Sequence, residues 1–291
     1  MHDDHQARLI DVGDTRLNVV ERGPADGYPV FVLHGGPGLD HHEFGDYLDP
    51  LGDRYRLVLV DMRSQGASDP APTDTWTIER MAADVTALAA GLELERYAVM
   101  GHSFGAFVAL RHAVDFPGFG QTIVSHGVPS ARYLDAVEAQ LATFDPIELR
   151  DQVKSSWERE LEARTPEDVD ELLVAQMPFH FANPLDPRID EYNRRSSGAR
   201  YSPEVIRTLA AAGYGGLELE GRLGEIRHPV LVLSGRHERT CAVEASEAMA
   251  AGIPGAELVV FEHSAHMSFA EETEAYLAAV RDFLDRNAAA A

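Results

Sequence analysis

The amino-acid sequence predicts an α/β fold in which helices cover both faces of a mostly parallel sheet. Short apolar runs without polar alternation recur along the chain, and segments with helical spacing separate them. Strands that are buried on both faces read as continuous hydrophobic runs, as is typical of parallel sheets. The expected strands are residues 29–34, 56–61, 96–100, 121–125, 229–234 and 256–262, and the expected helices include residues 77–90, 104–116, 242–251 and 273–286.

The order of these elements indicates the domain organisation. Residues 7–21 alternate around Gly13, which predicts a hairpin ahead of the first buried strand. The stretch 129–214 is charged, helical and interrupted by prolines, and it lies between two expected core strands. We therefore expect one α/β core formed by residues 1–128 and 215–291, with residues 129–214 inserted as a helical lid.

The composition restricts the classes of partner. The 291 residues include 25 Lys and Arg against 48 Asp and Glu, which gives a net charge of −23 and a sequence pI near 4.8. Nucleic acids and anionic lipid surfaces both require a positive footprint on the protein. We therefore expect no nucleic acid and no membrane as a partner, but a small-molecule or short-peptide substrate. The sequence leaves the oligomeric state open.

Cysteine content and hydropathy bear on cofactors and location. Cys241 is the single cysteine, which excludes an internal disulfide and a cysteine-based zinc cluster. His41, His42 and Glu43 are adjacent, and neighbouring side chains in a helix or strand point apart, so we expect no metal site and no cofactor. The N-terminal residues form no apolar signal segment, and no apolar run reaches the roughly 18 residues of a membrane span. A cytoplasmic protein is the expectation.

The most informative motif is Gly101-His102-Ser103-Phe104-Gly105. An apolar strand pattern precedes it and a helical pattern follows it. In this context a GxSxG sequence places the serine on a strained turn, with its Oγ exposed, while the glycines allow close approach of the backbone. Ser103 is therefore the candidate nucleophile.

A glycine-rich turn, His34-Gly35-Gly36-Pro37-Gly38, follows the first buried strand. Acyl transfer needs backbone N–H groups directed at the oxygen that becomes negative in the tetrahedral intermediate. Proline has no N–H, so Gly36 is the expected donor from this loop. The N–H of Phe104, the residue after the nucleophile, is the expected second donor.

The ends of the fifth and sixth strands supply a candidate acid and base. Glu238 follows the fifth strand, where a carboxylate fixes the tautomer of a catalytic imidazole and stabilises the imidazolium that forms. His266 follows the sixth strand and would take the Ser103 proton as general base. His263 competes for this role. We favour His266 because it lies a few residues into the loop, just before the last helix.

The chain order Ser103, Glu238, His266 is that of α/β-hydrolases. Further motifs are HGGPG at residues 34–38, a DxRGxGxS-like segment at 61–68 and SAHM at 264–267. With them the chain resembles, over essentially its whole length, the proline iminopeptidase-like branch of the α/β-hydrolase superfamily. The resemblance implies an α/β-hydrolase fold and a Ser-His-acid enzyme that works through an acyl-enzyme. Its substrate would be an N-terminal proline or another small acyl or amide compound, since many relatives are esterases, amidases or lactonases.

Three positions depart from the family pattern. The elbow reads GHSFG where proline iminopeptidases usually carry GGSWG, and Ser64 replaces a glycine of the 61–68 segment. The acid is Glu238 instead of aspartate, and one extra methylene displaces the carboxylate by more than about 1 Å unless its neighbours move. We also expect Asp61 and Arg63 to form an internal ion pair that braces the loops around the site.

The lid is expected to supply the substrate contacts. Exopeptidases of this branch capture the amino terminus of the substrate with lid carboxylates, for which the candidates are Glu158, Glu160, Glu162, Asp190, Glu191 and Glu204. The expected apolar acyl pocket consists of Leu39, Phe104, Phe179, Phe181, Tyr201, Tyr214 and Met267.

These features predict a serine hydrolase of small apolar esters or amides, with removal of an N-terminal proline as one specific form. One alternative is an esterase or lactonase of secondary metabolism. Another is a non-catalytic small-molecule receptor on the same fold. Epoxide hydrolases and haloalkane dehalogenases are disfavoured because their chemistry uses a carboxylate nucleophile, whereas position 103 is serine.

Overall fold

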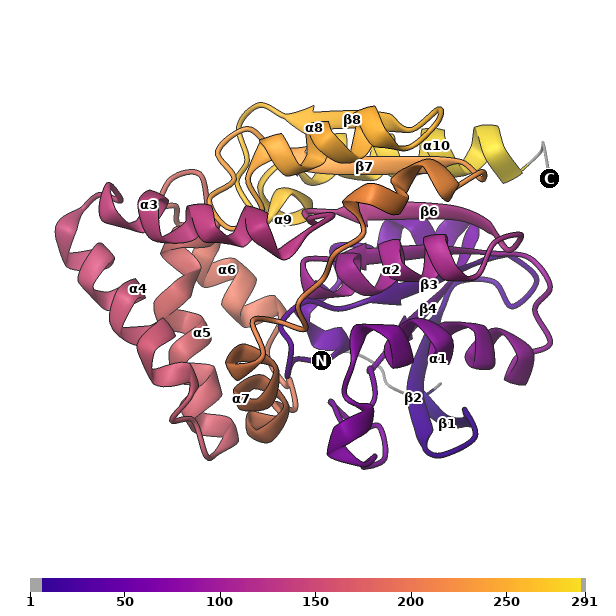
Figure 1. The fold of residues 1–291 in the computed structure, drawn as a ribbon, viewed down its shortest axis with the longest axis horizontal. Coiled ribbons are helices and arrows are strands. Elements are labelled where there is room, and N and C mark those ends of the chain that lie inside the picture. Colours follow the sequence, from indigo (N-terminus) through magenta and orange to yellow (C-terminus); the bar gives the residue numbers. More distant parts are fainter. Residues whose placement is uncertain (1–6, 289–291) are drawn as a thin grey trace.

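The computed structural model describes residues 7–288 and contains an eight-stranded sheet (Figure 1). Its strand order is β1-β2-β4-β3-β5-β6-β7-β8. The N-terminal residues 1–6, on which the expectation about a signal segment depends, lie outside the described residues. The strands are β1 (Ala7–Asp11), β2 (Arg16–Arg22), β3 (Tyr28–Leu33), β4 (Tyr55–Val60), β5 (Tyr97–His102), β6 (Gly120–Ser125), β7 (Val230–Gly235) and β8 (Glu257–Phe261).

The sheet is parallel except at one edge. β2 runs antiparallel to both β1 and β4, and β1 and β2 form the expected hairpin around Gly13, whose φ of 103° lies in the left-handed region that glycine tolerates. Every pairing from β4 through β3, β5, β6 and β7 to β8 is parallel. The predicted fold class is confirmed.

Helices cover both faces of the sheet, and the alternation within β3 shows how the two cores are separated. Phe31 and Leu33 belong to one core cluster, while Val30 and Val32 belong to the other, because successive strand residues point to opposite faces. Helices α1 (Ile78–Gly91), α2 (Phe104–Asp115) and α8 (Val243–Gly252) pack on the first face, and α9 (Ser268–Glu271) and α10 (Thr273–Ala288) pack on the second. Short 3₁₀ turns lie at His41–Phe44, Asp49–Asp53, Thr73–Thr75, Ala131–Asp135 and Glu220–Glu225.

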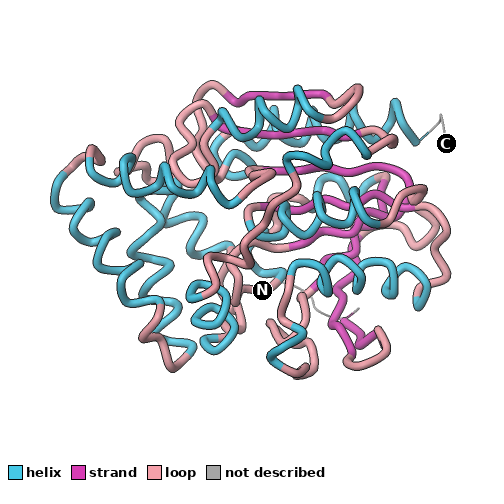
Figure 2. The backbone as a smooth tube through the Cα atoms, viewed as in Figure 1, coloured by secondary structure: helices cyan, strands magenta, loops and turns pink. Residues whose placement is uncertain are grey.

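The chain between β6 and β7 is helix and loop, and it stands beside the sheet (Figures 1 and 2). Thr165 begins α5 with a capping box in which its side chain accepts from the backbone of Asp168. A single bridge between Ser130 and Glu218 ties the two ends of the segment together. Its helices are α3 (Ala136–Ala142), α4 (Ile147–Glu160), α5 (Pro166–His180), α6 (Arg188–Arg195) and α7 (Pro203–Ala211). We call this segment the lid. None of the helices between residues 7 and 288 is long and apolar enough to cross a membrane.

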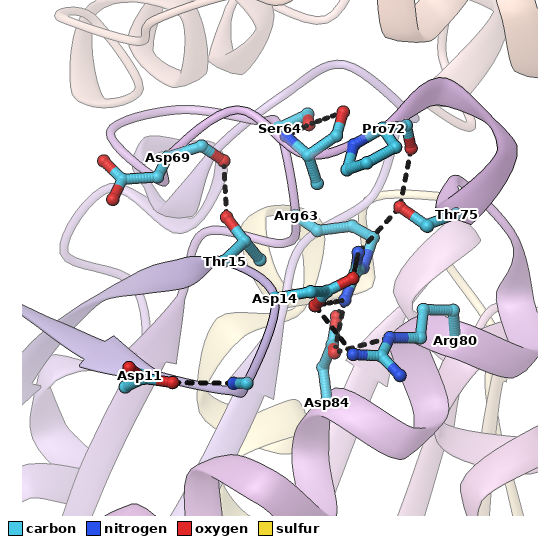
Figure 3. A network of polar contacts seen from close by, with 12 residues as sticks. Asp11, Asp14, Thr15, Arg63, Ser64, Asp69, Pro72, Thr75, Arg80 and Asp84 are labelled. Atoms are coloured by element: carbon cyan, nitrogen blue, oxygen red, sulfur yellow. Dashed lines mark hydrogen bonds and ion pairs between the residues drawn. The ribbon is translucent and has the colours of Figure 1, made fainter.

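The expectation that Asp61 and Arg63 form an ion pair is wrong. Arg63 is fully buried and turns instead to the carboxylates of Asp84, at 2.7 Å, and Asp14, at 3.2 Å (Figure 3). Asp61 accepts from the Nδ1 of His41 at 2.7 Å. The chain leaves β4 at Asp61 and turns at Arg63, so each side chain takes a partner from a different element.

Ser64, the residue that replaces the family's glycine, occupies the left-handed region with φ of 61°. Its hydroxyl accepts hydrogen bonds from the backbone of Ala71 at 2.8 Å and from the indole of Trp76 at 2.9 Å. A non-glycine residue at positive φ is strained, and these bonds offset that strain. The substitution is therefore a local adjustment of the loop next to the Arg63 network (Figure 3).

Candidate active site

Ser103 lies on a sharp turn between β5 and α2. Its φ of 52° and ψ of −118° are unfavourable for a residue with a side chain. A Cβ on Gly101 would approach the backbone oxygen of Gly105 to 2.0 Å, and a Cβ on Gly105 would approach the oxygen of Leu33 to 2.3 Å. Both flanking positions therefore require glycine, and the strand-turn-helix context of the GxSxG motif is present.

Glu238 and His266 meet at the same edge of the sheet, where the carboxyl ends of parallel strands gather. The Nδ1 of His266 lies 2.8 Å from Oε2 of Glu238, and both side chains are almost fully buried. Ser103 and His266 line one cavity. The competitor His263 is exposed, and its backbone N–H donates to Glu272. The structure thus brings His266, and not His263, to the cavity of Ser103.

The carboxylate of Glu238 receives donors on both oxygens. Oε1 accepts from the backbone N–H groups of Thr240 at 2.8 Å and Cys241 at 3.2 Å. Oε2 accepts from His266 and also from Nδ1 of His126, again at 2.8 Å. Burial alone would raise the pKa of Glu238, but the charge of His266 and the hydrogen bonds from the two histidines hold it well below its usual value.

His126 is a site residue that the sequence motifs do not mark. It directly follows β6, so the signal that could have found it is its place at a strand end beside the other site residues. Its side chain is fully buried, and desolvation lowers its pKa. Burial also opposes protonation of His266, yet Glu238 raises the pKa of His266 above its usual value.

Within the part of the chain that the structure describes, the N–H of Gly36 in the loop after β3 has no side-chain acceptor. The N–H of Gly35 donates to Oε2 of Glu43 at 2.6 Å, and the N–H of Gly38 donates to Oε1 of Gln65 at 2.6 Å. Pro37 has no N–H, so Gly36 is the candidate oxyanion donor that remains. Phe104 is the first residue of α2, where the N–H has no intrahelical acceptor.

Glu43 is a second buried carboxyl group beside Ser103, and no sequence motif predicts it there. A Cβ on Gly35 would meet Oε1 of Glu43 at 2.6 Å and the Cβ of Ser103 at 3.2 Å, so the two residues flank the same glycine. Burial raises the pKa of Glu43 to about 7. Protonation of this group near neutral pH therefore changes the charge next to Ser103.

Two clusters place ligand-type atoms within 4.8 Å of one another: Asp40, His41 and His42, and His126, Glu238 and His266. The expectation that His41 and His42 point apart is wrong, since their ring centroids lie 4.2 Å apart. In both clusters the Nδ1 atoms already contact carboxylates. These contacts are those of hydrogen-bonded networks, and we assign no metal to either cluster.

A cavity of about 570 Å³ opens at Ser103 and extends under the lid. Of the expected pocket residues, Leu39, Phe104, Tyr201, Tyr214 and Met267 line it. The other two, Phe179 and Phe181, do not. Both have no exposed surface: Phe179 packs on Phe144 and Trp157 of the lid, and Phe181 packs in the core cluster around α10. That expectation is corrected, because these rings are structural.

Among the candidate lid carboxylates, the structure singles out Glu160. Its side chain is buried on the cavity wall, where Gln176 and Tyr214 each donate to it at 2.7 Å. Burial raises its pKa, while these two hydrogen bonds oppose the rise. Glu158, Glu162, Asp190 and Glu204 are exposed, and Glu191 pairs with Arg195. Asp170, which is not among the sequence candidates, also lines the cavity and accepts from Tyr201 at 3.0 Å.

The end of α5 is attached to the loops that carry the acid and the base. The guanidinium of Arg239 donates to the backbone oxygens of Phe179, Phe181 and Ala182 at 2.7 to 3.1 Å. Glu271 accepts from the backbone of Ala182 and of Ala265 at 2.8 Å, and the backbone of His266 donates to that of His180 at 2.9 Å. One corner of the lid and the loops that carry Glu238 and His266 therefore form one structural unit.

Comparisons with known proteins agree with the observed fold. A family model described as the alpha/beta hydrolase fold matches residues 28–273. The chain belongs to the α/β-hydrolase fold family. A proline iminopeptidase of Heyndrickxia coagulans is 28% identical over 271 residues, which cover 89% of this chain and 91% of the relative.

Solved structures of α/β-hydrolases show the same fold. An α/β fold family hydrolase from Bacillus anthracis has a TM-score of 0.80 at 20% identity, and the match covers 96% of this chain and 99% of the hydrolase chain. An esterase from Exiguobacterium antarcticum has a TM-score of 0.74 at 24% identity, and the match covers 96% of this chain and 100% of the esterase chain. The chain is a serine hydrolase of the α/β-hydrolase fold family, and it is similar over most of its length to proline iminopeptidases.

Proposed function

We propose that this α/β-hydrolase cleaves small apolar esters or amides through an acyl-enzyme on Ser103. His266 Nε2 takes the Ser103 proton as Oγ attacks the carbonyl carbon, and the N–H groups of Gly36 and Phe104 stabilise the oxyanion. The tetrahedral intermediate collapses when His266 returns the proton to the leaving group. Water then repeats the sequence on the acyl-enzyme and releases the acid.

Glu238 has the role of the orienting acid in this mechanism. As a carboxylate it only accepts hydrogen bonds, so His266 must carry its proton on Nδ1 and leave the Nε2 lone pair free for Ser103. The observation that carries the proposal is the contact between Nδ1 of His266 and Oε2 of Glu238 at 2.8 Å, beside a strained serine on the same cavity.

We infer that the substrate class includes peptides or amides with an N-terminal proline. Glu160 supports this inference because it is a buried carboxyl group on a mainly apolar cavity wall, suited to bind the amine of a substrate. The similarity to proline iminopeptidases over most of the chain also favours it. Hydrolysis of uncharged esters or lactones is the second candidate, and it is favoured by the two neutral donors that already occupy the Glu160 oxygens.

Substrate comparison with a matched pair of variants tests this assignment. Prolyl-β-naphthylamide and a short p-nitrophenyl ester are compared on wild type, Glu160→Gln and Glu162→Gln, the last being an exposed control on the same lid. An aminopeptidase should lose at least about tenfold in kcat/KM on the prolyl substrate in Glu160→Gln, the effect of one charge-assisted contact. The ester rate should change little.

The outcomes separate the alternatives. No prolyl cleavage by wild type together with ester hydrolysis would leave the esterase function. Labelling of Ser103 by a fluorophosphonate, with a burst on p-nitrophenyl acetate, is the test of the nucleophile. Absence of both in folded protein would refute the catalytic mechanism and favour a small-molecule receptor.

A further inference from the structure

One oxygen of Glu238 serves two histidines. Oε2 lies 2.8 Å from Nδ1 of His266 and 2.8 Å from Nδ1 of His126, while Oε1 faces two backbone N–H groups. A carboxylate oxygen has two lone pairs, so each oxygen accepts from two donors. The carboxylate is therefore held at a fixed position and rotation by groups from three loops.

The tautomer of His126 follows from this contact. Because ionised Glu238 can only accept, His126 must carry its proton on Nδ1, as His266 does. Its Nε2 is buried and meets no hydrogen-bonding group in the described part of the chain. The one polar contact that the described structure gives the His126 ring is thus the one with the carboxylate of Glu238.

The backbone at His126 is also unusual. Its φ of 55° lies in the left-handed region, and its N–H donates to Leu233 in β7 at 2.8 Å. Strained backbone and a buried imidazole each cost stability unless they serve the surrounding structure. Here both direct the Nδ1–H at Glu238.

We propose that His126 is a positioning residue that acts through Glu238, fixing the longer acid against the base and sharing the acceptor that sets the basicity of His266. This inference rests on the proposed triad. His126 does not touch the reacting atoms. The shared contact explains how a glutamate serves where the family usually has aspartate. The extra length of the Glu238 side chain brings Oε2 between the imidazoles of His126 and His266.

The basicity of His266 also responds to its other neighbours. Six titratable side chains face the imidazole of His266. The histidines are His102 at the end of β5, His126 after β6 and His180 at the end of α5, and the carboxyl groups are Glu43 in the 3₁₀ turn after β3, Glu238 after β7 and Glu271 in α9. The imidazoles of His102 and His180 are uncharged at neutral pH because burial lowers their pKa. Loss of the His126 donor concentrates the Glu238 charge on His266, so the pKa of His266 rises.

The test uses His126→Leu, which removes the donor at similar volume, and His126→Asn, whose amide N–H takes the place of Nδ1–H and tolerates positive φ. His112→Leu is the control, since His112 is another buried histidine but lies on α2, where it packs beside Tyr97 at the start of β5 and beside Phe119. With a p-nitrophenyl ester, His126→Leu should lose about tenfold in kcat with KM within about twofold, the loss of one hydrogen bond to a charged group.

The pH profile separates positioning from mere structural support. In His126→Leu the acid limb of kcat/KM should move to higher pH, and His126→Asn should restore both kcat and the limb. An unchanged kcat and limb in folded His126→Leu would overturn the proposal. Equal losses in His126→Leu and His112→Leu, with neither limb displaced, would also overturn it.

A readout that needs no activity keeps this inference separate from the proposed function. Proton NMR of the wild type should show strongly deshielded imidazole N–H signals from both His126 and His266, beside the signal of His41, which donates to Asp61. One deshielded signal should be absent in His126→Leu, and a spectrum of His126→Leu that retains every such signal would refute the shared carboxylate. Failure of Ser103 to react with fluorophosphonate, with both signals present, would instead refute the hydrolase mechanism.

Discussion

Replacement of Glu238 by aspartate tests whether the reach of this side chain holds the base in place. Aspartate is shorter by one carbon–carbon bond, about 1.5 Å. If its carboxylate stays with the backbone of Thr240 and Cys241, the distance to His126 and His266 grows from 2.8 Å to as much as about 4.3 Å, beyond hydrogen-bond range. The donors come from separate loops, so no single shift restores all four contacts.

The expected magnitude follows from that loss. Complete removal of the orienting function of a triad acid costs about 10⁴ in kcat. Because the shorter aspartate would still carry its charge near His266, we expect a smaller fall of about 10² in kcat, equivalent to about 2.7 kcal/mol of transition-state stabilisation. KM should change little, since Glu238 does not line the cavity.

Steady-state hydrolysis of a p-nitrophenyl ester measures this effect, with the folded state checked by thermal unfolding. Glu262→Asp is the matched control, because Glu262 is exposed and pairs with Arg236 near the same edge of the sheet. A rate for Glu238→Asp within about twofold of wild type would show that the acid lies elsewhere or that the loops adjust freely, and the reasoning would fail.

Three further predictions concern pH and buried charge. Because Glu238 raises the pKa of His266 above 6.5, kcat/KM should fall as pH drops through that raised value, and an acid limb below 6.5 would contradict this. The pKa of Glu43 is raised from 4.5 to about 7, so between these pH values the folded state binds a proton that the unfolded state has lost, and the free energy of unfolding should decline by about 3 kcal/mol as pH rises from 4.5 to 7. Urea unfolding should show a smaller decline for Glu43→Gln, and the same decline in wild type and variant would argue against a raised pKa. Arg63→Met should cost about 3–5 kcal/mol in the same assay, because a buried carboxylate loses its partner; a loss below about 1 kcal/mol would mean that the network is dispensable.

The sequence predicts the sheet and the tight turn at Ser103 because both depend on local signals. Continuous apolar runs mark buried parallel strands, and the glycines around Ser103 satisfy contacts of the same turn. The positions of Glu238 and His266 at strand ends follow from the topology, since the carboxyl ends of parallel strands meet at one edge.

Long-range side-chain contacts are what the sequence does not contain. His126 meets Glu238 across 112 residues, and nothing near His126 in the chain marks this contact. An aromatic ring in the lid, such as Phe179, suggests a pocket wall, yet the direction of the ring depends on which helix packs against it. Proximity in sequence suggests a pair between Asp61 and Arg63, although their backbone directs them to different elements.

The contacts of Arg239 have a consequence for how new specificities arise in this scaffold. Its guanidinium binds three lid carbonyls, while its neighbour Glu238 holds the base. A lid transplanted from a related enzyme would replace the walls of the cavity but would also break or remake this junction. Recombination should therefore preserve turnover only when the crossover points leave residues 179–182 with the resident acid loop. The exchangeable lid then consists of two pieces, one before the final turn of α5 and one after residue 182.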